Sequence, residues 1–125
     1  MLLIGMAAIA LAVANVEAGD TTPAGPDRLI GRWARPDGGY ILEIKEIGND
    51  GTLRATYFNP RPINVSRAEA HQKHGTITLL VELRDVNYPG STYHLQYDPK
   101  TDRLIGTYFQ AVYGETYEIE FTRAP

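Results

Sequence analysis

Apolar and polar side chains alternate with a period of two along most of residues 29–122. Such alternation is typical of β-strands that have one buried face and one solvated face. Turn-forming residues interrupt the pattern at short intervals, as in GNDG at 48–51 and DPKTD at 98–102. They divide the segment into eight expected strands, at residues 29–34, 40–47, 52–59, 63–70, 76–86, 91–97, 103–112 and 115–122.

The short connections between these strands restrict the fold class. No ten-residue helical pattern separates them, so the crossovers that a parallel sheet needs are not expected. A meander of antiparallel strands leaves two unpaired edges unless it closes on itself. We therefore predict an all-β, eight-stranded antiparallel up-and-down barrel, with a two-sheet β-sandwich as the alternative.

The fourth expected strand has the least regular sequence. Pro60 and Pro62 precede it, which places it at an edge or a corner of the sheet. Residues 63–74 also fit a short helix, with Ser66 as N-cap and Glu69 at the capping-box position. The meander on both sides favours the strand.

The N-terminal region differs in composition from the rest of the chain. Leu2–Ala14 is an apolar run, shorter than the ~20 residues that span a bilayer. Residues 1–18, ending in VEA, are typical of a signal peptide, although no Lys or Arg precedes the run. We expect export, a flexible leader at 19–27 and a folded domain at 28–125; a hydrophobic N-terminal anchor is the alternative.

The composition excludes several functional classes. The chain has no cysteine, which rules out disulfides, thiol catalysis and zinc–thiolate sites. Its formal net charge is -3, and no basic run offers a footprint for nucleic acid. We expect a secreted or periplasmic protein with no nucleic-acid partner and no stable membrane span.

The tyrosines give the clearest indication of a ligand-binding site. The eight tyrosines all lie between Tyr40 and Tyr117, and a buried tyrosine needs a partner for its hydroxyl group. Tyr40, Tyr57, Tyr93 and Tyr108 are predicted to project into one cavity and to bind a small polar or aromatic ligand. The alternative is that they fill the barrel and bond to one another, since eight strands leave little interior space.

Other polar constellations give weaker indications. His71 and His74 share a face only on a helix, so we favour a solvated turn over a metal site. His94, Asp85 and Ser91 have the composition of a catalytic triad, but no G-x-S-x-G motif is present. We expect no catalytic residue, no metal and no cofactor.

Gly31-x-Trp33 at the start of the first expected strand resembles the glycine-x-tryptophan motif of the calycins, the group of lipocalins, fatty-acid-binding proteins and avidins. The hairpins up to Tyr57 resemble the avidin branch most. The resemblance implies that Trp33 plugs one barrel end beneath Arg123. It also implies a ligand-binding Tyr57, with Asn59 where a hydroxyl residue is usual. Biotin binders have several pocket tryptophans, whereas this chain has one.

These features favour an exported, non-enzymatic binding protein that holds a small ligand, or contacts a protein partner, at the barrel mouth. The expected mouth loops are residues 59–63, 86–90 and 112–115. Two alternatives remain: a lipocalin-like exported protease inhibitor or other interaction module, and an enzyme that uses the barrel cavity.

Overall fold

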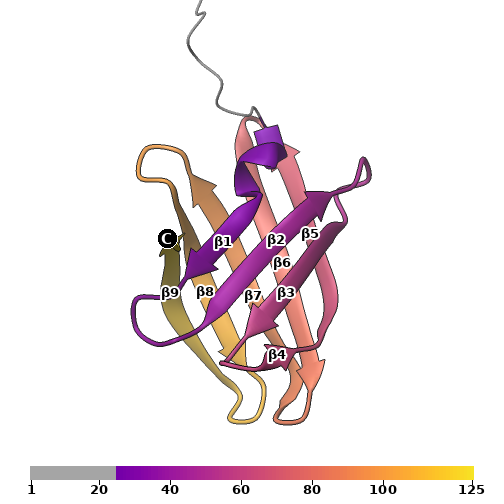
Figure 1. Cartoon of the computed structure of the whole chain (residues 1–125), viewed down its shortest axis with the longest axis vertical. Helices are drawn as coiled ribbons and strands as arrows, with labels where there is room; N and C mark the ends of the chain where they lie inside the picture. Colours follow the sequence, from indigo (N-terminus) through magenta and orange to yellow (C-terminus); the bar gives the residue numbers. More distant parts are fainter. Residues whose placement is uncertain (1–24) are drawn as a thin grey trace, which may run out of the picture.

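Residues 25–125, the part of the chain that the computed structural model describes, form nine β-strands and one short 3-10 helix (Figure 1). The predicted signal peptide and most of the predicted leader lie outside these residues. The elements are η1 (Gly25–Leu29), β1 (Gly31–Ala34), β2 (Ile41–Ile47), β3 (Leu53–Phe58), β4 (Pro62–Ile63), β5 (Val65–Lys73), β6 (Thr76–Asp85), β7 (Tyr88–Asp98), β8 (Arg103–Gln110) and β9 (Glu115–Arg123).

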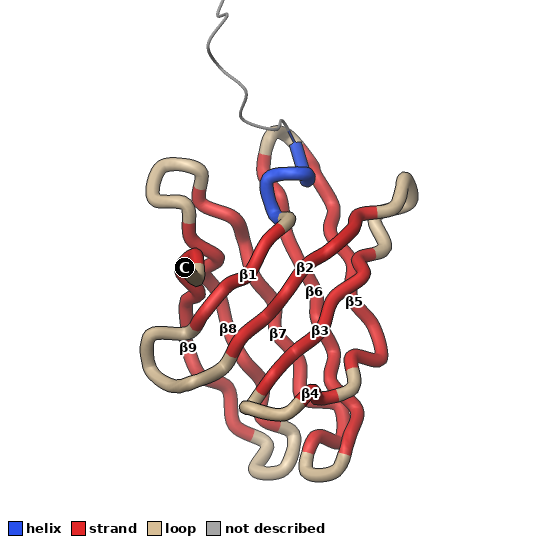
Figure 2. The backbone as a smooth tube through the Cα atoms, in the orientation of Figure 1, coloured by secondary structure: helices blue, strands red, loops and turns tan. Residues whose placement is uncertain are grey.

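All the strands belong to one antiparallel sheet, in the order β4-β3-β2-β1-β9-β8-β7-β6-β5. The first and last strands are neighbours, because Trp33 pairs with Arg123 and Ala34 with Thr122. Figure 2 shows the sheet wrapping round on itself. The prediction of an antiparallel up-and-down barrel is therefore confirmed, and the sandwich alternative is not.

The expected strand at 63–70 is present, but it is broken into β4 and β5 at Asn64. This break raises the number of strands from eight to nine, and the helical alternative for this region is wrong. Pro62 has no N–H to donate, which limits β4 to two pairs with β3. The barrel is nearly closed, since only the bridge Thr52↔Glu69 joins β3 to β5.

One barrel end is closed by η1, which includes the first residue of the expected strand at 29–34. Leu29 accepts a hydrogen bond of 2.9 Å from the Trp33 indole N–H. The Arg123 guanidinium lies 3.9 Å from the centroid of that indole and donates to the Ile30 carbonyl at 2.9 Å. Trp33 thus forms an internal plate at this end, held by the chain before β1 and by the last strand.

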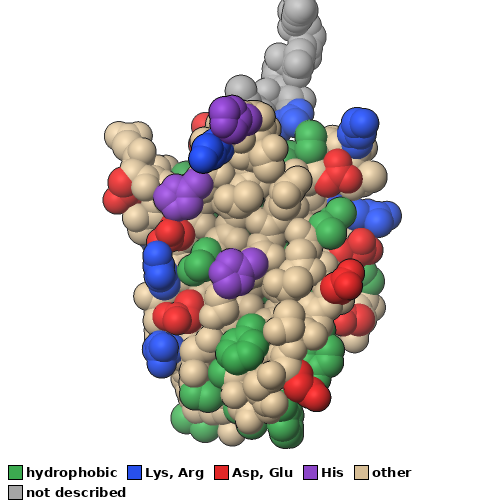
Figure 3. Space-filling view, turned by 180° about the vertical axis from the view of Figure 1, so that it is seen from behind, with side chains coloured by type: hydrophobic (Ala, Val, Ile, Leu, Met, Phe, Trp, Pro, Cys, Tyr) green, Lys and Arg blue, Asp and Glu red, His purple; other side chains and the backbone are tan. Residues whose placement is uncertain are grey.

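The core is one cluster of aliphatic and aromatic side chains. The largest fully buried side chains include Trp33, Tyr57, Tyr93 and Phe121. Acidic and basic side chains are interspersed on the outer face seen in Figure 3. No helix within residues 25–125 is long and apolar enough to cross a membrane. The open end of the barrel, opposite η1, is where side chains border a cavity.

Candidate functional site: a tyrosine-lined cavity at the barrel mouth

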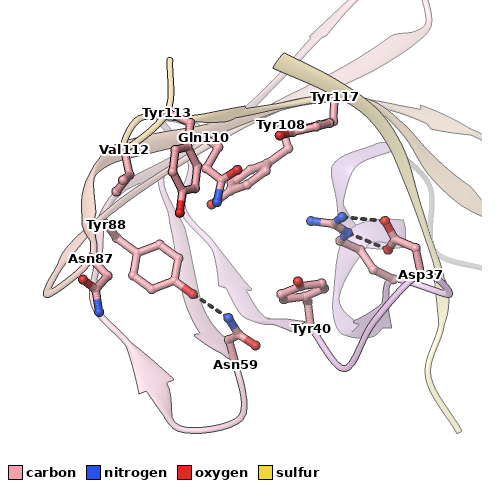
Figure 4. A pocket seen from close by; sticks show the side chains of 11 residues that line it. Asp37, Tyr40, Asn59, Asn87, Tyr88, Tyr108, Gln110, Val112, Tyr113 and Tyr117 are labelled. Carbon is pink, nitrogen blue, oxygen red and sulfur yellow. Dashed lines mark hydrogen bonds and ion pairs between the residues drawn. The ribbon is translucent and has the colours of Figure 1, made fainter. Parts of the chain in front are cut away.

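A cavity of about 490 Å³ opens at the end of the barrel opposite η1 (Figure 4). Its size lies within the range of roughly 300–1,000 Å³ that is usual for small-molecule sites. The β1–β2, β6–β7 and β8–β9 turns and the ends of β3, β8 and β9 all contribute to it. We call it the mouth cavity; its lining residues are Arg35, Asp37, Tyr40, Asn59, Asn87, Tyr88, Tyr108, Gln110, Val112, Tyr113 and Tyr117.

Two buried tyrosines lie beneath the cavity, on the inward faces of β3 and β7. The hydroxyl groups of Tyr57 and Tyr93 are 2.7 Å apart, and Arg35 Nη1 donates to the Tyr93 hydroxyl at 2.9 Å. Burial raises the pKa of Tyr93 to about 12 and also raises the pKa of Tyr57. Both side chains are therefore neutral at physiological pH.

Arg35 and Asp37 form an ion pair at the cavity wall. Arg35 Nε and Nη2 donate to the two carboxylate oxygens of Asp37 at 2.8 and 2.6 Å. Arg35 is only 8% exposed. Burial opposes its charged form, but hydrogen bonds to Asp37 and Tyr93 outweigh burial and raise the pKa of Arg35. The hydrogen bonds from Arg35 lower the pKa of Asp37. The pair is ionised and has no net charge.

Aromatic rings surround the guanidinium of this pair. Its carbon lies 4.3 Å from the ring centroid of Tyr40 and 5.6 Å from that of Tyr108. These are cation–π distances, at which tyrosine faces stabilise a cation. Arg35 is thus fixed by Asp37, by Tyr93 and by two ring faces.

Amide side chains complete the polar part of the lining. Asn59 Nδ2 donates to the Tyr88 hydroxyl at 2.6 Å, which joins the end of β3 to the start of β7. Asn87, just before β7, has a φ of 71°, a left-handed conformation that asparagine tolerates. The main-chain carbonyl of Gln110 accepts from the N–H groups of Tyr113 and Gly114 and holds the β8–β9 turn.

The five residues predicted as ligand-binding lie in one region, at two depths. Tyr40, Asn59 and Tyr108 line the mouth cavity. Tyr57 and Tyr93 lie below it, with exposed fractions of 1% and 0%. The structure therefore brings all five together, but only the first three border open volume.

Several lining residues were not singled out from the sequence. Arg35 continues the inward side of β1 two residues after Trp33, and Gln110 does the same after Tyr108 in β8. This two-residue spacing is the signal that could have found them. Tyr117 lies on the same side of β9 as Ile119 and Phe121, and it lines the cavity at the rim, where it is 43% exposed. Tyr88 and Tyr113 lie in or beside the predicted mouth loops at 86–90 and 112–115.

The histidines do not form a metal centre with other ligands. His71 Nε2 lies 3.0 Å from Glu69 Oε1, on the exposed side of β5. Within residues 25–125, no group of three or more His, Cys, Asp or Glu side chains is placed to hold a metal.

The three residues with the composition of a triad are not assembled. The Ser91 hydroxyl group is buried and accepts from the N–H of Ala111 at 3.1 Å. Asp85 accepts from the N–H groups of Asn64 and Val86. His94 is exposed on the opposite face of β7 from Ser91.

The nearly closed barrel is consistent with the resemblance to calycins. Its first strand pairs with its last, and Arg123 covers Trp33 at the closed end. Comparisons with protein-family models, with curated proteins and with solved structures give no match to this chain.

Proposed function

We propose that the protein binds a small molecule in the mouth cavity and does not transform it chemically. One observation supports this proposal above all: four separate segments of the chain, residues 35–40, 59, 87–88 and 108–117, direct tyrosine, amide and arginine side chains to one open volume of about 490 Å³. A pocket that is formed before its ligand arrives avoids much of the ordering cost of binding.

The electrostatics favour binding over catalysis. A general acid or base works best when its pKa lies near the operating pH. Here burial moves the pKa of Tyr93 to about 12, and the pKa of Arg35 is raised further above neutrality. Both shifts fix the groups in their resting protonation states.

The proposal includes export and a calycin-like ancestry. The apolar run at residues 2–14, the VEA sequence ending at Ala18 and the absence of cysteine support export from a bacterial cell. Sequencing the N-terminus of the secreted or periplasmic protein tests this point: we expect it to begin at or near Gly19. A full-length, membrane-retained chain would contradict export.

Ligand-observed NMR with a library of small, soluble fragments tests the binding function. Tyr113→Ala is the informative variant, because Tyr113 lines the cavity yet is 70% exposed, so its removal has little cost in stability. The control is Phe109→Ala, which removes a partly exposed ring from the outer face of β8. Fragments should lose affinity for Tyr113→Ala only. Equal loss in both variants, or no binding fragment, refutes the proposal.

A protein partner at the mouth is the second candidate function. Val86 is 80% exposed and Val112 is 51% exposed, and each lies in a turn at this end of the barrel. Exposed apolar side chains near a cavity are common at interaction sites. Val86 does not line the cavity, so Val86→Ser should abolish a partner contact and leave fragment binding unchanged.

A further inference from the structure

The charges at the mouth cavity restrict the ligands that it accepts. Arg35 and Asp37 are the charged residues among its lining, and they neutralise each other through two hydrogen bonds. A cationic ligand would meet the Arg35 guanidinium, which already occupies the face of Tyr40 at 4.3 Å. An anionic ligand would meet the carboxylate of Asp37, whose side chain is 55% exposed. The site therefore favours a neutral ligand.

The polar lining indicates how many hydrogen bonds such a ligand must make. Asn59, Asn87 and Gln110 each present an amide, which carries two donor hydrogens and an acceptor oxygen. The single aliphatic side chain of the lining is Val112. An apolar ligand would take these amides out of water without replacing their hydrogen bonds, which is unfavourable. A ligand with several hydroxyl groups supplies donors and acceptors together.

The aromatic part of the lining offers several separate ring faces to a ligand. Tyr40, Tyr88 and Tyr113 stand around the cavity in Figure 4, on different sides of the open space. The described ring pairs connect lining tyrosines only to Tyr57 and Tyr93 below, never to one another. The lining rings that stand around the cavity thus present separate faces to it. Separate ring faces suit the C–H surfaces of a saturated ring.

From these three observations we propose that the mouth cavity binds a neutral saccharide of one or two rings. The proposal rests on the small-molecule function above and specifies its ligand class. Hydroxyl groups of the sugar bond to the amides of Asn87 and Gln110, and its C–H faces lie against Tyr88 and Tyr113. The Arg35–Asp37 pair stays intact and offers further polar contacts without excess charge.

Titration of the ¹⁵N-labelled protein with sugars matched in shape and differing in charge tests the ligand class. The neutral probes are the methyl glycosides of glucose, galactose, mannose and N-acetylglucosamine, with cellobiose and maltose. The charged probes are glucuronate, and glucosamine at a pH where its amine is protonated. At least one neutral sugar should shift resonances at the mouth and bind about tenfold or more tightly than the charged sugars.

Variants locate the contact. Gln110→Ala should weaken the bound sugar by about 2- to 10-fold, as expected for the loss of one hydrogen bond. Asn87→Gly removes the second amide assigned to the sugar and should weaken binding likewise. Glycine accepts the φ of 71° at this position, so the turn is kept. Phe109→Ala, on the outer face of β8, should leave the affinity unchanged.

The possible results separate this inference from the proposed function. Adenosine and p-cresol serve as further probes that are not sugars. If one of them, glucuronate or glucosamine shifts the mouth resonances and no neutral sugar does, the saccharide class is refuted while small-molecule binding stands. If no probe of any class shifts them, the saccharide class is refuted together with the proposed function. If a neutral sugar binds and neither amide variant weakens it, the assigned contact is refuted.

Discussion

The contact between Trp33 and Arg123 should be worth a measurable fraction of the barrel's stability. Trp33→Ala removes a fully buried indole and should cost about 3–5 kcal/mol, as large aromatic truncations do. For Arg123→Ala, the loss of the ring contact at 3.9 Å contributes about 1 kcal/mol. The hydrogen bond to Ile30 adds about 1.5 kcal/mol. The exposed pair with Asp102 at 3.0 Å adds at most about 1 kcal/mol. The total is about 3 kcal/mol.

A double-mutant cycle isolates the part that the two side chains share. Trp33→Leu is the better partner for the cycle, because it removes the π face yet retains much of the apolar volume. The free energy of unfolding is measured by urea denaturation, followed by far-UV circular dichroism since the lone tryptophan is lost. The double variant should be more stable than the sum of the single losses predicts, by about 1 kcal/mol.

A control variant separates this effect from the general loss of an arginine. Arg103→Ala removes a surface pair with Glu120 at 3.3 Å, in which both side chains are well exposed, and should cost less than about 1 kcal/mol. Losses in the cycle that add to within about 0.3–0.5 kcal/mol would refute the energetic role of the stack. Equal costs for Arg103→Ala and Arg123→Ala would refute the specific role of Arg123 at the closed end.

Further predictions concern the close approach of two strands, the buried hydroxyl groups and the cavity. An added Cβ at Gly106 would lie 1.9 Å from the His94 carbonyl oxygen, so Gly106→Ala should cost about 3 kcal/mol in urea denaturation, whereas Gly39→Ala, with open space around it, should be nearly neutral. Because folding raises the pKa of Tyr93 from 10.0 to about 12, its contribution to stability is fully present below pH 10 and is lost as pH rises towards 12, by about 3 kcal/mol. Tyr93→Phe should flatten that decline; an unchanged profile would contradict the assignment. Tyr57→Phe should lower the unfolding free energy by about 1–3 kcal/mol, because a hydroxyl partner of Tyr93 is lost. Tyr108→Phe should lower the unfolding free energy by about 0.5–1.5 kcal/mol, because the Tyr108 hydroxyl group bonds to the buried Ser91 side chain, and it should also weaken a bound ligand.

The strand pattern could be predicted where local alternation decides the structure. Apolar and polar residues alternate along most of 76–86, and the observed β6 has nearly the same bounds. One face of this strand packs against the core and the other faces solvent. The break at Asn64 could not be predicted, nor could the single bridge that joins the β3 side of the barrel to β5. They depend on Pro62 and on which edge each strand meets across the barrel, and alternation carries no information on either.

The site could be predicted in part for the same reason. Tyr40, Asn59 and Tyr108 follow from counting alternate residues into the barrel, because that count places them on its inward side. Arg35 also lies two residues after Trp33, but it opens the RPDGG segment, whose composition is typical of a turn. Its inward direction depends on Tyr93, which lies 58 residues away and becomes a neighbour only in the folded barrel. The depth of Tyr57 and Tyr93 below the cavity likewise depends on side chains packed above them.

Tyrosine-selective ¹³C labelling offers the most direct test of the central claim, that the mouth cavity holds a small ligand. All eight tyrosines of the chain lie in the described barrel, and five of them line the cavity: Tyr40, Tyr88, Tyr108, Tyr113 and Tyr117. The labelled protein is titrated with the low-molecular-weight extract of the cells and medium from which it comes. Ring resonances of the cavity tyrosines should shift, whereas those of Tyr97, at the closed end, should not. A spectrum that stays unchanged, or that shifts first at Tyr97, would contradict the claim.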